Sequence, residues 1–425
     1  MNTRAVSIDS PEIVKLTTGT TWLARLARRI VLSRLEKLRD GQIVVIENGE
    51  AMTLGHLSED FPQSVQLHVL DPNFYSDIAF GGAIGAGESY MSGHWTCNGL
   101  VDLLRILLRN RDVLEQVDSG LAVLSTPMRK IFHTLNKNTR KGSRKNIAAH
   151  YDLGNDFYQL WLDPKMMYSC AYFDEPDTSL EAAAIEKLDR ICRKLDLSSE
   201  DSVIEIGTGW GGFAIHAAKR YGCHVTTTTI SQQQYDFAQQ AVIDAGLEDK
   251  VTLLLKDYRD LDGSFDKLVS IEMIEAVGHE FHEDYFKKCS SLLKPNGQML
   301  LQAITITDQR YDQYKTGVDF IKRYIFPGGC LTSVTDMSQS MTRHTDMRVI
   351  HLEDIGPHYA TTLNRWHERV LARIDDVREL GYSESFIRMW QYYLCYCESA
   401  FIERATGTVQ MLIMRPGARR ERIQY

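Results

Sequence analysis

The 425-residue sequence lacks the features of a membrane-spanning, secreted or nucleic-acid-binding protein. No apolar run reaches the roughly 18 residues that a membrane span needs. The eight cysteines are scattered, with no spacing typical of a disulfide framework or a zinc site, and no signal peptide is evident. We therefore expect a cytoplasmic protein without a bound metal. The formal net charge of −8 argues against nucleic acid as a partner.

A glycine-rich turn is the most informative feature that is present. Residues 203–206 are typical of a buried strand, residues 207–212 read Gly-Thr-Gly-Trp-Gly-Gly, and a helix is expected from Phe213. Such a turn lets the backbone approach a ligand closely at a helix N-terminus, although a structural turn without a ligand is the alternative. The next strand, 224–229, ends without the acid that a dinucleotide-binding enzyme uses for the ribose.

Strand and helix patterns alternate after this turn. This alternation predicts a parallel sheet with helices on both faces and a ligand site at the carboxyl ends of the strands. A last strand is predicted over 408–414, and residues 311–343 are expected to form a lid. Strands are predicted over 203–206, 224–229, 251–256, 267–273 and 298–306.

Two basic stretches favour peripheral contact with an anionic membrane. Residues 22–38 predict a helix with Leu23, Leu26 and Ile30 on one face and arginines around the other. Residues 129–145 hold seven lysines and arginines between polar spacers. A solvated helix face and an exposed linker are the alternatives. Between these stretches, Asn48-Gly49 separates two strand-like runs and predicts a hairpin. Residues 74–84, which run into glycines, are compatible with a helix or a strand.

Six separate stretches carry a resemblance to a known family: 150–158, 168–172, 207–212, 229–234, 273–278 and 357–359. They resemble the cyclopropane-fatty-acyl-phospholipid synthases, which are class I S-adenosylmethionine (SAM) methyltransferases. The resemblance implies an α/β fold with a Rossmann-like seven-stranded sheet, whose last strand enters antiparallel, and a small α+β N-terminal lipid-binding domain. The domains expected are a disordered segment 1–20, an N-terminal domain 21–125, a basic linker 126–147 and a catalytic domain 148–425.

The resemblance also implies which residues bind SAM. Gly207, Thr208 and Gly209 would approach its amino-acid end, and Tyr168 and Ser169 would close over its methionine portion. Residues after the next two strands would surround the ribose and the adenine. These residues are Thr229, Ile230 and Gln234 for the ribose and Asp257 and Tyr258 for the adenine. A helix N-cap is the alternative role for Asp257.

The family's reaction adds the SAM methyl group to a cis double bond and then removes a proton as a ring closes. The resemblance implies a bound bicarbonate as the base, held by Cys170, Glu275, Gln302, Ile304 and Tyr359. Gln302 stands where many members carry His, and an amide can donate a hydrogen bond but cannot shuttle a proton. Glu275 is expected to orient the anion, and Cys170 to contribute its backbone and packing more than a nucleophilic thiol.

The first functional hypothesis is therefore SAM-dependent transfer of a methylene group to unsaturated acyl chains of membrane phospholipids, by a homodimer at the inner face of the cell membrane. Because of Gln302, C-methylation that leaves a methyl or methylene branch is the nearest alternative. Two further hypotheses are a small-molecule N-methyltransferase and a lipid-binding protein without catalytic activity.

Overall fold

The computed structural model describes residues 22–112, 114 and 153–419. Met1–Ser125 and Thr126–Tyr425 form two compact units, which are described separately below. The predictions made for residues 1–20 and for the basic stretch 129–145 lie outside the described residues. Among the described residues, no helix is both long enough and apolar enough to cross a membrane.

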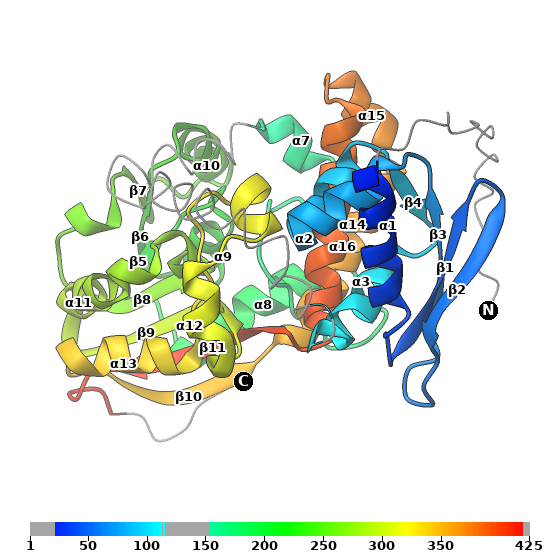
Figure 1. The fold of residues 1–425 in the computed structure, drawn as a ribbon. Helices are drawn as coiled ribbons and strands as arrows, with labels where there is room; N and C mark the ends of the chain where they lie inside the picture. The colour runs from blue at the N-terminus through cyan, green and yellow to red at the C-terminus, as the bar shows by residue number, and fades with distance from the viewer. Residues whose placement is uncertain (1–21, 113, 115–152, 420–425) are drawn as a thin grey trace. The chain divides into compact units, whose positions relative to one another are not determined.

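The N-terminal unit is built on a four-stranded sheet with the order β2-β1-β3-β4 (Figure 1). The predicted hairpin is confirmed: β1 and β2 pair antiparallel, and Asn48 and Gly49 between them have φ angles of 53° and 84°. Residues 74–84, for which a helix and a strand were both open, belong to a helix. The elements are α1 (Trp22–Leu35), β1 (Gly41–Glu47), β2 (Glu50–His56), β3 (Ser64–Val69), α2 (Asn73–Met91), β4 (Trp95–Cys97) and α3 (Leu100–Arg109).

The C-terminal unit contains a seven-stranded sheet with the order β10-β11-β9-β8-β5-β6-β7. Strands β7, β6, β5, β8 and β9 are parallel, and β11 lies antiparallel to β9, as predicted. The predicted strands agree with the observed ones to within a few residues at each end. The strands are β5 (Ser202–Ile206), β6 (His224–Thr229), β7 (Val251–Leu255), β8 (Phe265–Ile271), β9 (Leu293–Ile306), β10 (Arg348–Asp354) and β11 (Thr406–Met414).

Helices cover both faces of this sheet, as the alternating pattern predicts. Neighbouring strand residues point to opposite faces, so Val203 packs with one core and Ile204 with the other. Helices α8 (Leu180–Leu195), α9 (Gly212–Tyr221) and α10 (Gln232–Asp244) contribute to the core around Val203, whereas α11 (His282–Leu292) and α13 (Val334–His344) contribute to the core around Ile204.

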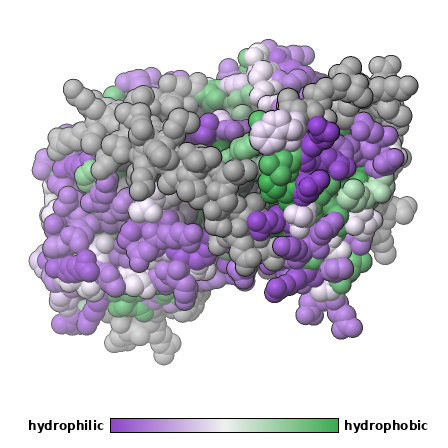
Figure 2. Space-filling model, viewed as in Figure 1, coloured by the Kyte–Doolittle hydropathy of each residue, from purple (hydrophilic) through white to green (hydrophobic). Residues whose placement is uncertain are grey.

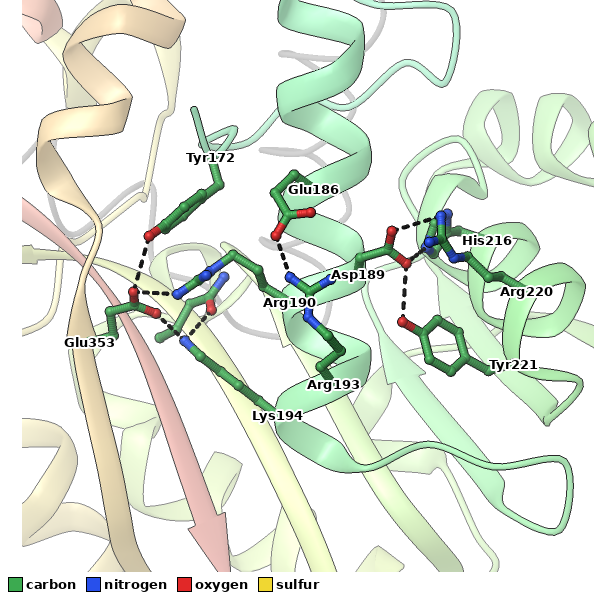
Figure 3. Close-up of polar contacts among 11 residues, drawn as sticks. Tyr172, Glu186, Asp189, Arg190, Arg193, Lys194, His216, Arg220, Tyr221 and Glu353 are labelled. Carbon is green, nitrogen blue, oxygen red and sulfur yellow. Dashed lines mark hydrogen bonds and ion pairs between the residues drawn. The ribbon is translucent and has the colours of Figure 1, made fainter. Parts of the chain in front are cut away.

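Helix α8 is fixed on two sides by polar contacts (Figure 3). Arg190 and Lys194 bind Glu353 of β10, with 2.6 Å between the Arg190 guanidinium and Glu353 Oε1. On the other side, Asp189 lies 2.8 Å from His216 of α9 and also binds Tyr221. These contacts hold α8 between the antiparallel edge of the sheet and α9.

The chain between β9 and β10 forms α12 (Asp308–Thr316), a π-helical turn (Ile321–Ile325) and α13. Met337 and Met341 of α13 are buried in the core, so α13 cannot belong to the predicted lid. Only the residues of 311–343 that precede Val334 can form one. Three helices follow β10: α14 (Gly356–Ala372), α15 (Ile374–Glu379) and α16 (Glu384–Ile402). Cys395 and Cys397 lie within α16.

Candidate active site

The glycine-rich turn follows β5 at the carboxyl edge of the sheet. Gly207, Gly209 and Gly211 have φ angles of 105°, 53° and 92°, which favour glycine over other residues. The N–H groups of Gly207 and Thr208 both donate to the Thr228 carbonyl at the end of β6, 3.1 and 3.0 Å away. A Cβ atom built on Gly209 would meet no atom within 4 Å, so this side of the turn is open.

The ends of β6 and β7 place the other predicted cofactor residues along the same edge. The Thr229 hydroxyl donates to Gln234 Oε1 over 2.9 Å, and both side chains are buried. Ile230 between them is half-buried. The neighbouring Gln233 Oε1 is buried without a hydrogen-bond partner among the described residues, which leaves an acceptor for a ligand.

Asp257 follows β7 and caps the short helical turn that begins at Tyr258. Its carboxylate accepts from the Arg259 backbone N–H over 3.0 Å and from two nitrogens of the Arg259 guanidinium over 2.8 Å each. Tyr258 packs on Tyr285, and the Tyr258 hydroxyl is buried with no hydrogen-bond partner within residues 22–112, 114 and 153–419. The N-cap considered as an alternative is therefore present, together with an ion pair that a ligand would have to share.

The segment before α8 brings Tyr168, Ser169 and Cys170 to this region. The Tyr168 hydroxyl lies 2.8 Å from that of Tyr393, and the Ser169 hydroxyl accepts from Lys187 Nζ over 2.8 Å. The Cys170 thiol contacts two backbone carbonyl oxygens, 3.3 and 3.7 Å away, and burial raises its pKa well above the ordinary value. A neutral thiol of this kind is a packing group and not a nucleophile.

Glu272, directly after β8, lies among the residues predicted to bind an anion. Its Oε1 accepts from the Cys170 backbone N–H over 2.9 Å and from the Gln302 amide over 2.8 Å. Its Oε2 accepts from the Tyr359 hydroxyl over 2.8 Å. One buried carboxylate thus joins the segment before α8, strand β9 and helix α14.

The orientation of Gln302 is set by a series of hydrogen bonds that crosses the sheet. Gln410 Nε2 of β11 donates to Gln302 Oε1 over 3.0 Å, and Lys194 Nζ donates to Gln410 Oε1 over 2.6 Å. Lys194 also binds Glu353, as Figure 3 shows. Because its oxygen is occupied by Gln410, Gln302 presents its NH₂ group to Glu272.

Glu275 lies apart from the three donors that bind Glu272. Its Oε1 accepts from the Ile304 backbone N–H over 2.5 Å, and its Oε2 is buried with no hydrogen-bond partner in the part of the chain that the structure describes. Burial and then the nearby charge of Glu272 raise the pKa of Glu275 to about 8, so this carboxyl is largely protonated at neutral pH. Ile304 therefore donates to Glu275, whereas Cys170, Gln302 and Tyr359 donate to Glu272.

An aromatic cluster adjoins Tyr359. The Tyr359 ring stacks on Phe401 with centroids 4.5 Å apart and meets the edge of Trp366 at 6.0 Å. Trp366 in turn contacts Tyr168 at 5.3 Å. Ring faces stabilise a nearby cation and keep water away from it. The cluster comprises Tyr158, Trp161, Tyr168, Phe326, Trp366, Trp390 and Tyr393.

Sequence reasoning missed Glu272 and Lys187. Lys187 is fully buried, and desolvation lowers its pKa to about 8 although nearby carboxylates, Glu272 foremost, oppose this. A signal for Lys187 was present, since it follows Ala183 and Ala184 and precedes Ile191 at helical spacing on the buried side of α8. Glu272 carries no comparable signal, because an acid after a strand is usual at a solvent-exposed turn.

The chain is similar to a group of lipid-modifying enzymes. The family model for mycolic acid cyclopropane synthetase matches residues 138–411. A tuberculostearic acid methyltransferase of Mycobacterium tuberculosis is 39% identical over 344 residues, which cover 79% of this chain and 80% of that protein. A cyclopropane-fatty-acyl-phospholipid synthase of Escherichia coli K12 is 39% identical over 351 residues, which cover 82% and 87%.

Solved structures agree with this assignment. A mycolic acid cyclopropane synthase complexed with SAH and CTAB superimposes with a TM-score of 0.60 and 30% identity over 64% of this chain and 98% of that one. The strand order, the glycine turn and these similarities lead to one conclusion: the chain belongs to the mycolic acid cyclopropane synthetase family and is a SAM-dependent methyltransferase.

Proposed function

We propose that this enzyme transfers a methylene group from SAM to the cis double bond of unsaturated acyl chains in membrane phospholipids and forms cyclopropane rings. The observation that carries the proposal is the half-buried Glu272, whose carboxylate accepts from Tyr359 beside an aromatic cluster. Attack of a double bond on a methyl donor leaves a cation on the acyl chain, which needs aromatic faces and then a base. The E. coli relative is named for this reaction.

The residues at the strand ends fit SAM. SAM supplies an electrophilic methyl group when it is bound. The open side of Gly209 admits the amino-acid end of the cofactor, and the unpaired Gln233 Oε1 and Tyr258 hydroxyl are available to its polar groups. We assign Gly207, Thr208, Thr229, Ile230, Gln234 and Asp257 to the same site, with Tyr168 and Ser169 on its other side.

Bicarbonate does not fit this arrangement. Of the five residues that the family resemblance implies as its ligands, Cys170, Gln302 and Tyr359 already bind Glu272. The Ile304 N–H is occupied by Glu275. An added anion would find these donors taken and would face the Glu272 carboxylate as a like charge.

C-methylation without ring closure is the second candidate. It is favoured by Gln302, which cannot carry a proton, and by the tuberculostearic acid methyltransferase, whose 39% identity equals that of the E. coli synthase. Mass spectrometry and proton NMR of phospholipids incubated with enzyme and SAM separate the two. A gain of one CH₂ with upfield cyclopropane protons supports the ring, the same gain with branch signals supports the alternative, and no gain rejects both.

Substitution at Gly209 tests the proposed SAM site. Gly209→Ala should weaken SAM binding roughly tenfold or more, since a Cβ would occupy the open side of the turn. Gly246→Ala is a matched control, because Gly246 has a φ of 63° and similarly open surroundings in the turn after α10. Calorimetric titration with SAM measures both variants. Equal affinities in the two would remove this turn from the cofactor site.

We also propose that the N-terminal unit docks on the anionic inner face of the cell membrane as the lipid-binding domain. Figure 2 shows apolar surface over α1 and α2 beside hydrophilic side chains. On α1, Trp22, Leu23 and Leu26 are 67%, 44% and 40% exposed, next to the exposed Arg25 and Arg29. Apolar and basic side chains together suit an anionic interface. A homodimer is a separate proposal that rests on the family resemblance, and light scattering tests it.

The exposed end of α1 can be altered without disturbing its buried side. The double variant Trp22→Ser, Leu26→Ser should bind anionic vesicles several-fold more weakly and lose more activity on vesicles than on detergent-dispersed lipid. Ala27, Val31, Leu32 and Leu35, which anchor the helix, are unchanged. Leu371→Ser, at an equally exposed leucine of α14, is the control. Equal losses on both lipid preparations would contradict docking through α1.

A further inference from the structure

The Glu272 carboxylate occupies the position where the family resemblance places a dissolved anion. Three groups from separate parts of the chain donate to it: the Cys170 N–H, the Gln302 amide and the Tyr359 hydroxyl. Each of these residues was predicted from sequence as a ligand of bicarbonate. A carboxylate and a bicarbonate both present two oxygens about a planar carbon, so one can replace the other against the same donors.

The backbone at Glu272 is unusual. Its φ angle is 50°, a left-handed conformation that is unfavourable for residues other than glycine. Its N–H donates to the Gln302 carbonyl over 2.7 Å, which holds this conformation against β9. Backbone strain of this kind is retained mainly at functional sites, and here its effect is to direct a carboxylate toward the three donors.

The surroundings of Glu272 raise its pKa above the ordinary value for a carboxyl. Desolvation is the main cause, and the three hydrogen bonds and the charge of Lys187 offset part of this rise. The Glu275 carboxyl has a pKa of about 8 and is largely neutral at pH 7, so the repulsion between the two acids is relieved. The titratable groups that face Glu272 are Cys170, Lys187, Glu275, Tyr359 and Tyr393.

We propose that Glu272 is the catalytic base of this enzyme and that it replaces an external bicarbonate. This inference rests on the proposed function. After the double bond has formed a C–C bond to the methyl carbon and the C–S electron pair has stayed on sulfur, the acyl chain is a cation. One Glu272 oxygen takes a proton from the transferred carbon, and the released C–H pair forms the last ring bond. The products are a neutral carboxylic acid, the cyclopropane and a neutral thioether.

The assignment predicts that wild-type activity is independent of bicarbonate. Turnover on phospholipid vesicles is measured in buffer depleted of carbon dioxide and again with tens of millimolar bicarbonate, and it should be the same in both. A wild-type enzyme that loses its activity on depletion would overturn the proposal. A wild-type enzyme that adds no CH₂ to any lipid would instead reject the proposed function, so the two failures are distinct.

Two substitutions then test the carboxylate itself. Glu272→Gln and Glu272→Gly should each lower kcat by roughly 10²–10⁴-fold, the usual contribution of a general base, with SAM affinity unchanged. Glycine also suits the left-handed backbone and leaves space before the three donors, so bicarbonate or formate should restore activity to Glu272→Gly but not to Glu272→Gln.

Asp196→Gly is the control for the backbone change, because Asp196 is exposed and has a φ of 56°. It should show no response to bicarbonate. Full activity in Glu272→Gln would overturn the proposal, and so would failure of both anions to restore activity to a folded, SAM-binding Glu272→Gly.

Discussion

A Lys187→Met variant should lose activity at neutral pH and recover part of it as the pH rises. Lys187 is buried beneath the site, and its positive charge lowers the pKa of Glu272. With a pKa of about 8, Lys187 is largely protonated at pH 7. Without it, the raised pKa of Glu272 rises further, and the proposed base is protonated over a wider range of pH.

The Lys187→Met variant should shift the acidic limb of the pH profile in one direction only, toward higher pH. A base acts only when deprotonated, so activity disappears as pH falls through the Glu272 pKa, and removal of the cation moves this limb to higher pH. Turnover below the limb should fall about tenfold for each unit by which the pKa rises. The profile of kcat against pH at saturating SAM measures this shift. Lower kcat with an unmoved acidic limb would assign Lys187 a purely structural role.

The largest loss of stability is expected from Trp161→Ala. Trp161 is completely buried and contacts Tyr168, Trp366 and Trp390 at centroid distances of 5.4–5.7 Å. Truncation of a buried tryptophan removes its apolar contacts and leaves a cavity, which costs about 3–5 kcal/mol of the free energy of unfolding. Denaturant titration with an unchanged m-value measures the loss.

Two further variants serve as controls for the stability loss of Trp161→Ala. Trp161→Phe keeps a ring in the cluster and should recover part of the loss. Trp22→Ala truncates the same residue type where it is 67% exposed, so its effect should be within about 0.5 kcal/mol. A loss below 1 kcal/mol in Trp161→Ala would mean that the neighbouring rings collapse into the space.

The sheet of the C-terminal unit could be predicted because its sequence signals are local. A glycine-rich turn directly follows the apolar strand 203–206, and Gly222 lies just before the strand 224–229. The Asn48-Gly49 hairpin was equally clear, because both residues adopt the left-handed conformation. Residues 74–84 were ambiguous, since their glycines weaken helix and strand alike, and only packing makes α2 a helix.

The sequence predicts several of the residues that meet at the candidate site, but it does not predict which of them form hydrogen bonds with one another. Cys170, Gln302 and Tyr359 do converge, yet the acid among them is Glu272, three residues before the expected Glu275. Both acids follow β8. The sequence does not show that Glu272 adopts a left-handed backbone conformation, which turns its side chain inward. The protonated state of Glu275 depends on desolvation of its carboxyl and on the nearby Glu272, which no local pattern encodes.

The hydrogen bonds from Lys194 through Gln410 to Gln302 constrain how this site can evolve. A neutral histidine at position 302 also carries one donor and one acceptor, but on a ring of different shape, so the hydrogen bonds to Glu272 and Gln410 would both have to be rearranged. The three positions are therefore expected to be epistatic: an exchange that harms the enzyme alone becomes tolerable when its neighbours change with it. Transitions between an internal carboxylate and a dissolved anion would then require coordinated substitution at 272, 302 and 410.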